Sequence, residues 1–123
     1  MSAITRTPSD LPLPFSKAVE AGGFLFLSGQ IALGQDGAAL HGTIEEQTSN
    51  VLDRIAATLE QLDSKLADVV RVTVWLSDLT LFARFNAVYR DYFKAPDLPA
   101  RSTVRAQLAF HVDVEIEVTA YRR

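Results

Sequence analysis

The chain has 123 residues, of which 48% are hydrophobic and 22% charged, with a formal net charge of −3 and no cysteine. This length predicts a single domain over residues 1–123 with a substantial core. The mildly acidic net charge argues against nucleic-acid binding, which needs clustered Lys and Arg. The absence of cysteine excludes disulfides, thiolate nucleophiles and cysteine-ligated metals, and no run is apolar enough for a signal peptide or a membrane span, so we expect a cytoplasmic protein without membrane contact.

The N-terminal part of the sequence predicts a β-hairpin. Residues 1–14 are rich in Pro, Ser and Thr and show no period, so we expect a loose leader over residues 1–11. Strands are predicted over residues 15–21 and 24–28, and two glycines supply the turn between them. The second strand is followed by a short polar segment around Gly29, here called the polar step. This step is either an ordinary turn or the rim of a site, because a glycine lets the backbone come close to a ligand.

The middle of the chain predicts a helix, a strand and a second helix. Thr43 and Glu46 have the spacing of a capping box, and apolar residues follow at helical intervals. Residues 69–76, "VVRVTVWL", are rich in β-branched side chains and predict a strand. Its alternation assigns one face to Val70, Val72, Val74 and Leu76. Residues 81–93 predict the second helix, which the prolines that follow bring to an end.

Two strands close the chain, over residues 101–109 and 112–121. The element order is then β-β-α-β-α-β-β, an α+β fold in which both helices cover the apolar face of one sheet. The other face is predicted to carry Arg71, Trp75, Arg101, Thr103, Glu115, Glu117 and Tyr121. This mixture is too aromatic for a solvent surface and too charged for a core, so we expect a subunit interface with polar clefts in a homo-oligomer.

Arg101 and Glu115 are the candidates for chemistry. Arg101 could grip a substrate carboxylate with two parallel hydrogen bonds, or could form a structural ion pair. Glu115 shares a face with Glu117 and could act in acid–base catalysis if burial raised its pKa, or could lie on a charged outer face. His41 and His111 have no partner at ligand spacing, so we expect no metal site. Phosphate-binding glycine loops and a serine-nucleophile motif are absent from the sequence.

Several segments, taken in order, resemble the reactive intermediate deaminase family, also called RidA/YjgF. They are "PFSKAVEAGGFLFLSGQIAL", "QTSNVLDRIAATLE", "VVRVTVWLSDL", "FARFNAVYRDYF", "PARSTV" and "VEIEVTAY". Each fragment alone is weak, whereas the ordered set, which covers roughly residues 12–121, is specific. The resemblance implies a chorismate-mutase-like α+β fold and a homotrimer with its sites in the clefts between subunits.

The resemblance also implies a function, the hydrolytic deamination of reactive enamine or imine acids such as 2-aminoacrylate to 2-oxo acids and ammonia, without a cofactor. Position by position, Arg101 matches the arginine that binds the substrate carboxylate, and Glu115 matches the glutamate that positions or activates water. Gly29 and Asn86 match residues near the cleft. Thr103 stands where many members have cysteine, and the backbone does the binding there.

Two features depart from the family pattern. Phe15, at a substrate-binding position, stands where active members usually have tyrosine, and it lacks the hydroxyl donor. The segment after "PARSTV" lacks the usual leucine–proline. These departures keep open a second hypothesis, a non-catalytic protein of the same fold that binds small carboxylates such as 2-oxo acids. A third hypothesis, ribonuclease activity, is disfavoured by the acidic balance and by the lack of a histidine pair.

Overall fold

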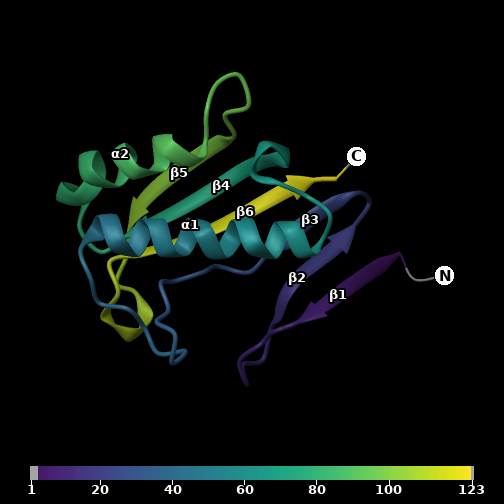
Figure 1. The fold of residues 1–123 in the computed structure, drawn as a ribbon, viewed down its shortest axis with the longest axis horizontal. Coiled ribbons are helices and arrows are strands. Elements are labelled where there is room, and N and C mark those ends of the chain that lie inside the picture. The colour runs from purple at the N-terminus through teal and green to yellow at the C-terminus, as the bar shows by residue number, and fades with distance from the viewer. Residues whose placement is uncertain (1–2, 123) are drawn as a thin grey trace.

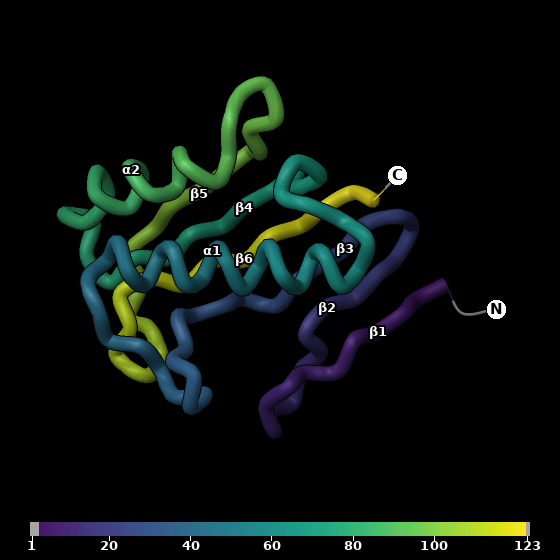
Figure 2. The backbone as a smooth tube through the Cα atoms, viewed as in Figure 1, coloured from purple at the N-terminus to yellow at the C-terminus, as the bar shows by residue number. Residues whose placement is uncertain are grey.

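The computed structural model describes residues 3–122, and its strands form one sheet with two helices on one face (Figure 1, Figure 2). The elements are β1 Ile4–Pro8, β2 Ser16–Ala21, β3 Phe24–Leu27, α1 Ile44–Gln61, β4 Val69–Leu76, α2 Phe82–Tyr92, β5 Ala100–Arg105 and β6 Val114–Tyr121. The order across the sheet is β1-β2-β3-β6-β4-β5, in which β4 and β5 are parallel and the other neighbours antiparallel. The predicted α+β fold, with both helices on one face, is confirmed.

Strand β1 contradicts the prediction of a loose leader over residues 1–11. It pairs antiparallel with β2, with Ile4 opposite Ala21 and Thr7 opposite Ala18. Most of its side chains are exposed, so no hydrophobic period marks it in the sequence, and backbone pairing with β2 holds it in place. The element order therefore gains one strand and becomes β-β-β-α-β-α-β-β.

Helix α1 begins where the capping box predicts. The Glu46 N–H donates to Thr43 Oγ1 at 3.1 Å, and the Thr43 N–H donates to Glu46 Oε1 at 2.9 Å. These bonds satisfy amide groups that a helix start otherwise leaves without partners. The buried face of α1 packs on the sheet and includes Ile44, Val51, Leu52, Ile55 and Leu59. No helix within residues 3–122 is long and apolar enough to cross a membrane.

A β-bulge changes the alternation at the start of β4. The pairing with β6 shifts register between Val69 and Arg71, which leaves Val69 buried and Val70 45% exposed. The prediction that Val70 lies on the core face is therefore wrong, because one inserted residue reverses the alternation on its N-terminal side. From Val72 onward the predicted core face is confirmed.

The register of β5 places Arg101 and Thr103 on the helix-covered side of the sheet. In the parallel pair, Arg101 lies opposite Val72 and Thr103 opposite Val74, and both valines are buried beneath the helices. Residues that lie opposite each other in neighbouring strands point to the same face. The prediction that Arg101 and Thr103 share the mixed face with Glu115 is therefore wrong. Strand β5 carries polar residues on both of its faces. Its sequence alone therefore could not show which face points toward the helices.

Candidate functional site

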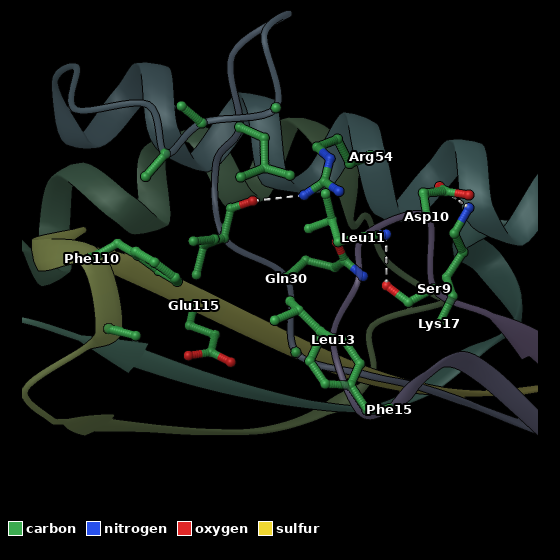
Figure 3. A pocket seen from close by; sticks show the side chains of 17 residues that line it. Ser9, Asp10, Leu11, Leu13, Phe15, Lys17, Gln30, Arg54, Phe110 and Glu115 are labelled. Carbon is green, nitrogen blue, oxygen red and sulfur yellow. Dashed lines mark hydrogen bonds and ion pairs between the residues drawn. The ribbon is translucent and has the colours of Figure 1, made fainter.

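A pocket of about 420 Å³ opens beside the C-terminal strand and brings together three residues that the sequence analysis singled out (Figure 3). Phe15 enters it from the segment just before β2, Gly29 from the polar step after β3, and Glu115 from β6. Segments far apart in the sequence thus meet at one cavity. Its volume lies in the range of small-molecule sites in proteins.

The polar step after β3 continues the sheet instead of leaving it. The Gln30 N–H donates to the Ile116 carbonyl at 2.8 Å, and the Ile116 N–H donates to the Gln30 carbonyl at 3.0 Å. This pairing sets Gly29 against Glu115 so closely that a Cβ on residue 29 would collide with the Glu115 carboxylate. The glycine at position 29 therefore allows the Glu115 carboxylate to lie where it does, and the step forms the rim of the pocket.

Glu115 is a half-buried carboxylate facing the pocket. It lies opposite Trp75 of β4 on the face that the helices leave open. Burial, and secondly the charge of Glu117, raise the pKa of Glu115 above its ordinary value. A carboxylate with a raised pKa is a stronger base than an ordinary carboxylate, which suits it to accept and return a proton.

Phe110, which the sequence analysis did not select, forms an aromatic wall of the same pocket. It lies in the turn before β6, where the backbone takes left-handed φ values of 61° at Phe110 and 55° at His111. The His41 Nε2–H donates to the Phe110 carbonyl at 2.7 Å and holds this turn. The signal that could have identified Phe110 was the departure of this segment from the family pattern.

Arg101, Asn86 and Thr103 form a second group, between β5 and α2. Arg101 Nη2 donates to Asn86 Oδ1 at 2.8 Å, and the Arg101 guanidinium carbon lies 4.6 Å from the centroid of the Tyr89 ring. Such stacking on an aromatic face orients a guanidinium. The Thr103 hydroxyl is buried and has no hydrogen-bond partner among the described residues.

The two groups lie on opposite faces of the sheet within one chain. Glu115 is on the open face, whereas Arg101 is on the helix-covered face of β5, which is the edge strand. Arg101 accordingly does not line the pocket that contains Phe15, Gly29 and Glu115. Residues 3–122 contain no group of three His, Asp or Glu side chains that could hold a metal ion.

Comparisons with known proteins agree on one family. The family model described as Endoribonuclease L-PSP matches residues 9–122. A RutC family protein of Pyrococcus abyssi is 42% identical over 111 residues, which is 89% of this chain and 87% of that protein. The chloroplastic Reactive Intermediate Deaminase A of Arabidopsis thaliana is 37% identical over 109 residues, which is 87% of this chain and 58% of that protein.

A solved structure gives the same result for the fold. The crystal structure of a YjgF family member from Neisseria meningitidis superposes with a TM-score of 0.85 at 34% identity, and the match covers 98% of this chain and 95% of that one. The chain therefore belongs to the Endoribonuclease L-PSP family, the YjgF and reactive intermediate deaminase (RidA) family that its ordered motifs resemble.

Proposed function

We propose that the protein hydrolyses reactive enamine and imine acids, such as 2-aminoacrylate, to 2-oxo acids and ammonia. The observation that carries the proposal is the half-buried Glu115, which faces a small-molecule pocket and has a raised pKa. Similarity to a protein named Reactive Intermediate Deaminase A supports the same reaction class. The proposal places this activity in the cytoplasm and requires no cofactor.

The proposed site lies between two subunits of a homotrimer. Arg101 and Glu115 are on opposite faces of the sheet in one chain, so a site that uses both needs Arg101 from one subunit and Glu115 from its neighbour. The open face of the sheet carries exposed aromatic side chains, among them Phe24, Phe26 and Tyr121, which suits a face buried in an assembly. Cyclic association of identical subunits repeats such a shared site at every interface.

The reaction needs only orientation and proton transfer. An enamine acid tautomerises to an imine, whose C=N carbon is an electrophile next to the carboxylate. Arg101 holds that carboxylate and so fixes the position of the carbon. Water adds to the carbon while Glu115 accepts one of its protons and passes it to the imine nitrogen, which gives a carbinolamine. Glu115 then accepts the hydroxyl proton and returns it to the nitrogen as the carbonyl forms. The C–N bond breaks, and a 2-oxo acid and ammonia leave.

A second candidate function is non-catalytic binding of small carboxylates. Phe15 favours it, because this ring lines the pocket without the hydroxyl donor that tyrosine would provide. Only the first function predicts that the bound imino acid is hydrolysed. Titration calorimetry with 2-oxobutyrate, together with a deaminase assay, separates them, since binding without hydrolysis supports the second candidate.

The direct test of the proposed function is the release of 2-oxo acid from 2-aminoacrylate generated in the assay by a pyridoxal-phosphate-dependent dehydratase. We expect the purified protein to accelerate release in proportion to its concentration. Release at the spontaneous rate over the whole concentration range contradicts the proposed function.

Mixed assemblies test whether the site is shared. Arg101→Ala and Glu115→Gln subunits, each inactive alone, are co-refolded in equal amounts. We expect about a quarter of the wild-type activity to return, because each interface of a cyclic assembly then receives both intact residues with a chance of about one in four. Mixing Arg101→Ala subunits with the Arg101→Ala/Glu115→Gln double variant is the control and should restore nothing. No recovery in the first mixture rules out a shared site.

Substitution of Gly29 by alanine tests the packing of the rim. The added Cβ displaces the flexible Glu115 carboxylate, so we expect kcat/KM to fall about 100-fold, as for a catalytic group misplaced by about 1 Å. The melting temperature should change little, because the group that must move is the end of a side chain. In a Glu115→Gln background the same substitution should have no further effect on kcat. A similar additional loss in both backgrounds would assign Gly29 a role independent of Glu115.

A further inference from the structure

The pocket has a second charged end, formed by Arg54 of α1. Figure 3 shows Arg54 and Glu115 on opposite sides of the cavity. Arg54 Nη1 donates to the Ile31 carbonyl at 2.7 Å, which fixes the guanidinium. Its remaining N–H groups form no hydrogen bond with residues 3–122 that would keep them from a ligand. Nothing in the sequence suggested this residue, because an arginine on an amphipathic helix is ordinarily a solvent-facing charge.

Arg54 lacks a counterion among the described residues. The guanidinium is half-buried, and none of the ion pairs within residues 3–122 involves it. Burial lowers the pKa of Arg54, and the charge of Asp10 opposes this shift. Asp10 itself is paired with Lys17, whose Nζ lies 2.6 Å from Asp10 Oδ2. A half-buried charge without a directly paired counterion is energetically costly, so an anionic ligand group at this place is favourable.

The surroundings of Arg54 indicate the charge of that group. At this end of the pocket two cations, Lys17 and Arg54, lie beside one carboxylate, Asp10, which leaves one net positive charge in a protein whose net charge is −3. Glu115 lies on the opposite side of the cavity. A second hollow of about 190 Å³ adjoins and shares Asp10, Lys17, Gln30 and Arg54 with the main pocket. One net positive charge matches a single carboxylate, whereas the adjacent Asp10 repels a dianionic phosphate.

The volume of the main pocket indicates a ligand longer than a three-carbon acid. Cavities of about 300–1,000 Å³ accommodate drug-sized molecules, and this one measures about 420 Å³. The wall of the pocket is largely apolar and includes Leu11, Leu13 and Ile31. Gln30 lies between Glu115 and Arg54 (Figure 3). A ligand with a polar group at each end and methylene groups between them matches this distribution.

We propose that Arg54 binds a second, distal carboxylate, so that the pocket selects dicarboxylic 2-imino and 2-oxo acids. The inference rests on the proposed function for the position of the first carboxylate, at Arg101 of a neighbouring subunit. Arg54 touches the part of the ligand remote from the reacting carbon, and it therefore determines specificity and takes no part in bond breaking.

The test compares two ligands of equal carbon number, 2-oxoglutarate and 2-oxopentanoate, which differ by a terminal carboxylate in place of a methyl group. Titration calorimetry on the full-length protein should give at least about tenfold tighter binding of 2-oxoglutarate, as expected for hydrogen bonds to a charged group. Arg54→Met should abolish this preference and leave the affinity for 2-oxopentanoate within about twofold. Arg54→Lys, which keeps a cation, should restore part of the preference.

Arg84→Met is the matched control. Arg84 lies on α2, is exposed, and forms an ion pair with Glu45 away from the pocket, at 2.7 Å. Its replacement should change neither affinity. Equal binding of the two ligands by the wild-type protein overturns the inference. Equal weakening of both ligands in Arg54→Met also overturns it, because Arg54 then acts only through the Ile31 carbonyl.

The outcomes also separate this inference from the proposed function. Binding of 2-oxoglutarate that depends on Arg54, without hydrolysis of any imino acid, supports the dicarboxylate site and contradicts the deaminase. Hydrolysis of 2-aminoacrylate without a preference for 2-oxoglutarate supports the deaminase and contradicts the dicarboxylate site.

Discussion

Arg101→Ala is expected to lower kcat/KM for 2-aminoacrylate hydrolysis at least about 100-fold. The proposed role of Arg101 is to hold the substrate carboxylate through charge-assisted hydrogen bonds, and each such bond contributes about 1.5–3 kcal/mol. The guanidinium is oriented before substrate arrives, by Asn86 at 2.8 Å and by the ring of Tyr89. Arg101→Lys should recover only part of the activity, because an ammonium cannot form two parallel bonds to a carboxylate.

Steady-state kinetics and light scattering check this prediction together. The molecular mass should stay that of the wild-type assembly, since Arg101 contributes one side-chain hydrogen bond and its ring contacts to the fold. Arg105→Ala is the control, because Arg105 lies on the same strand and is exposed. If Arg101→Ala retains full activity in an intact assembly, the assigned role is wrong.

Glu115→Gln is expected to lower kcat about 10²–10⁴-fold, the range lost with a general base. The affinity for a 2-oxo acid should change little, because the amide has nearly the same size as the carboxyl group. Stability at neutral pH should stay the same or rise. Since burial raises the pKa of Glu115 in the folded state, its ionisation disfavours folding as pH rises through that pKa, and glutamine removes the ionisation.

The pH dependence of the wild-type enzyme provides an independent test of Glu115. Water activation requires the ionised carboxylate, so kcat/KM should rise with pH through the raised pKa of Glu115. The Glu115→Gln variant should lack this acidic limb. Glu117→Gln is the matched variant, because the charge of Glu117 contributes to the shift, so its removal should move the limb to lower pH while kcat at neutral pH is retained. An acidic limb that persists in Glu115→Gln belongs to another group.

Elements with strong local signals were predicted with small errors at their ends. The capping box fixed the start of α1, and the β-branched run fixed β4 from Val69 to Leu76. Strand β1 was missed because exposed side chains carry no hydrophobic period and its stability comes from pairing with β2. The face of Val70 was wrong because a bulge is a property of two paired strands.

The pocket was only partly predictable. Phe15, Gly29 and Glu115 come from distant parts of the chain, and the family resemblance linked them before the structure did. Phe110 and Arg54 were missed, because nothing in the sequence distinguishes them from other turn residues and other arginines on helix surfaces. Their closeness to the pocket depends on backbone pairing and helix placement, which no local pattern encodes.

The sequence by itself determined both helices and every strand except β1, that the fold is α+β, and which family the chain belongs to. These properties depend on neighbouring residues, through caps, periodicity and ordered motifs. Only the tertiary structure decided that Arg101 and Glu115 lie on opposite faces of the sheet. The physical reason is that strand register is set by pairing between distant segments, and a shift of one residue sends every side chain to the other face.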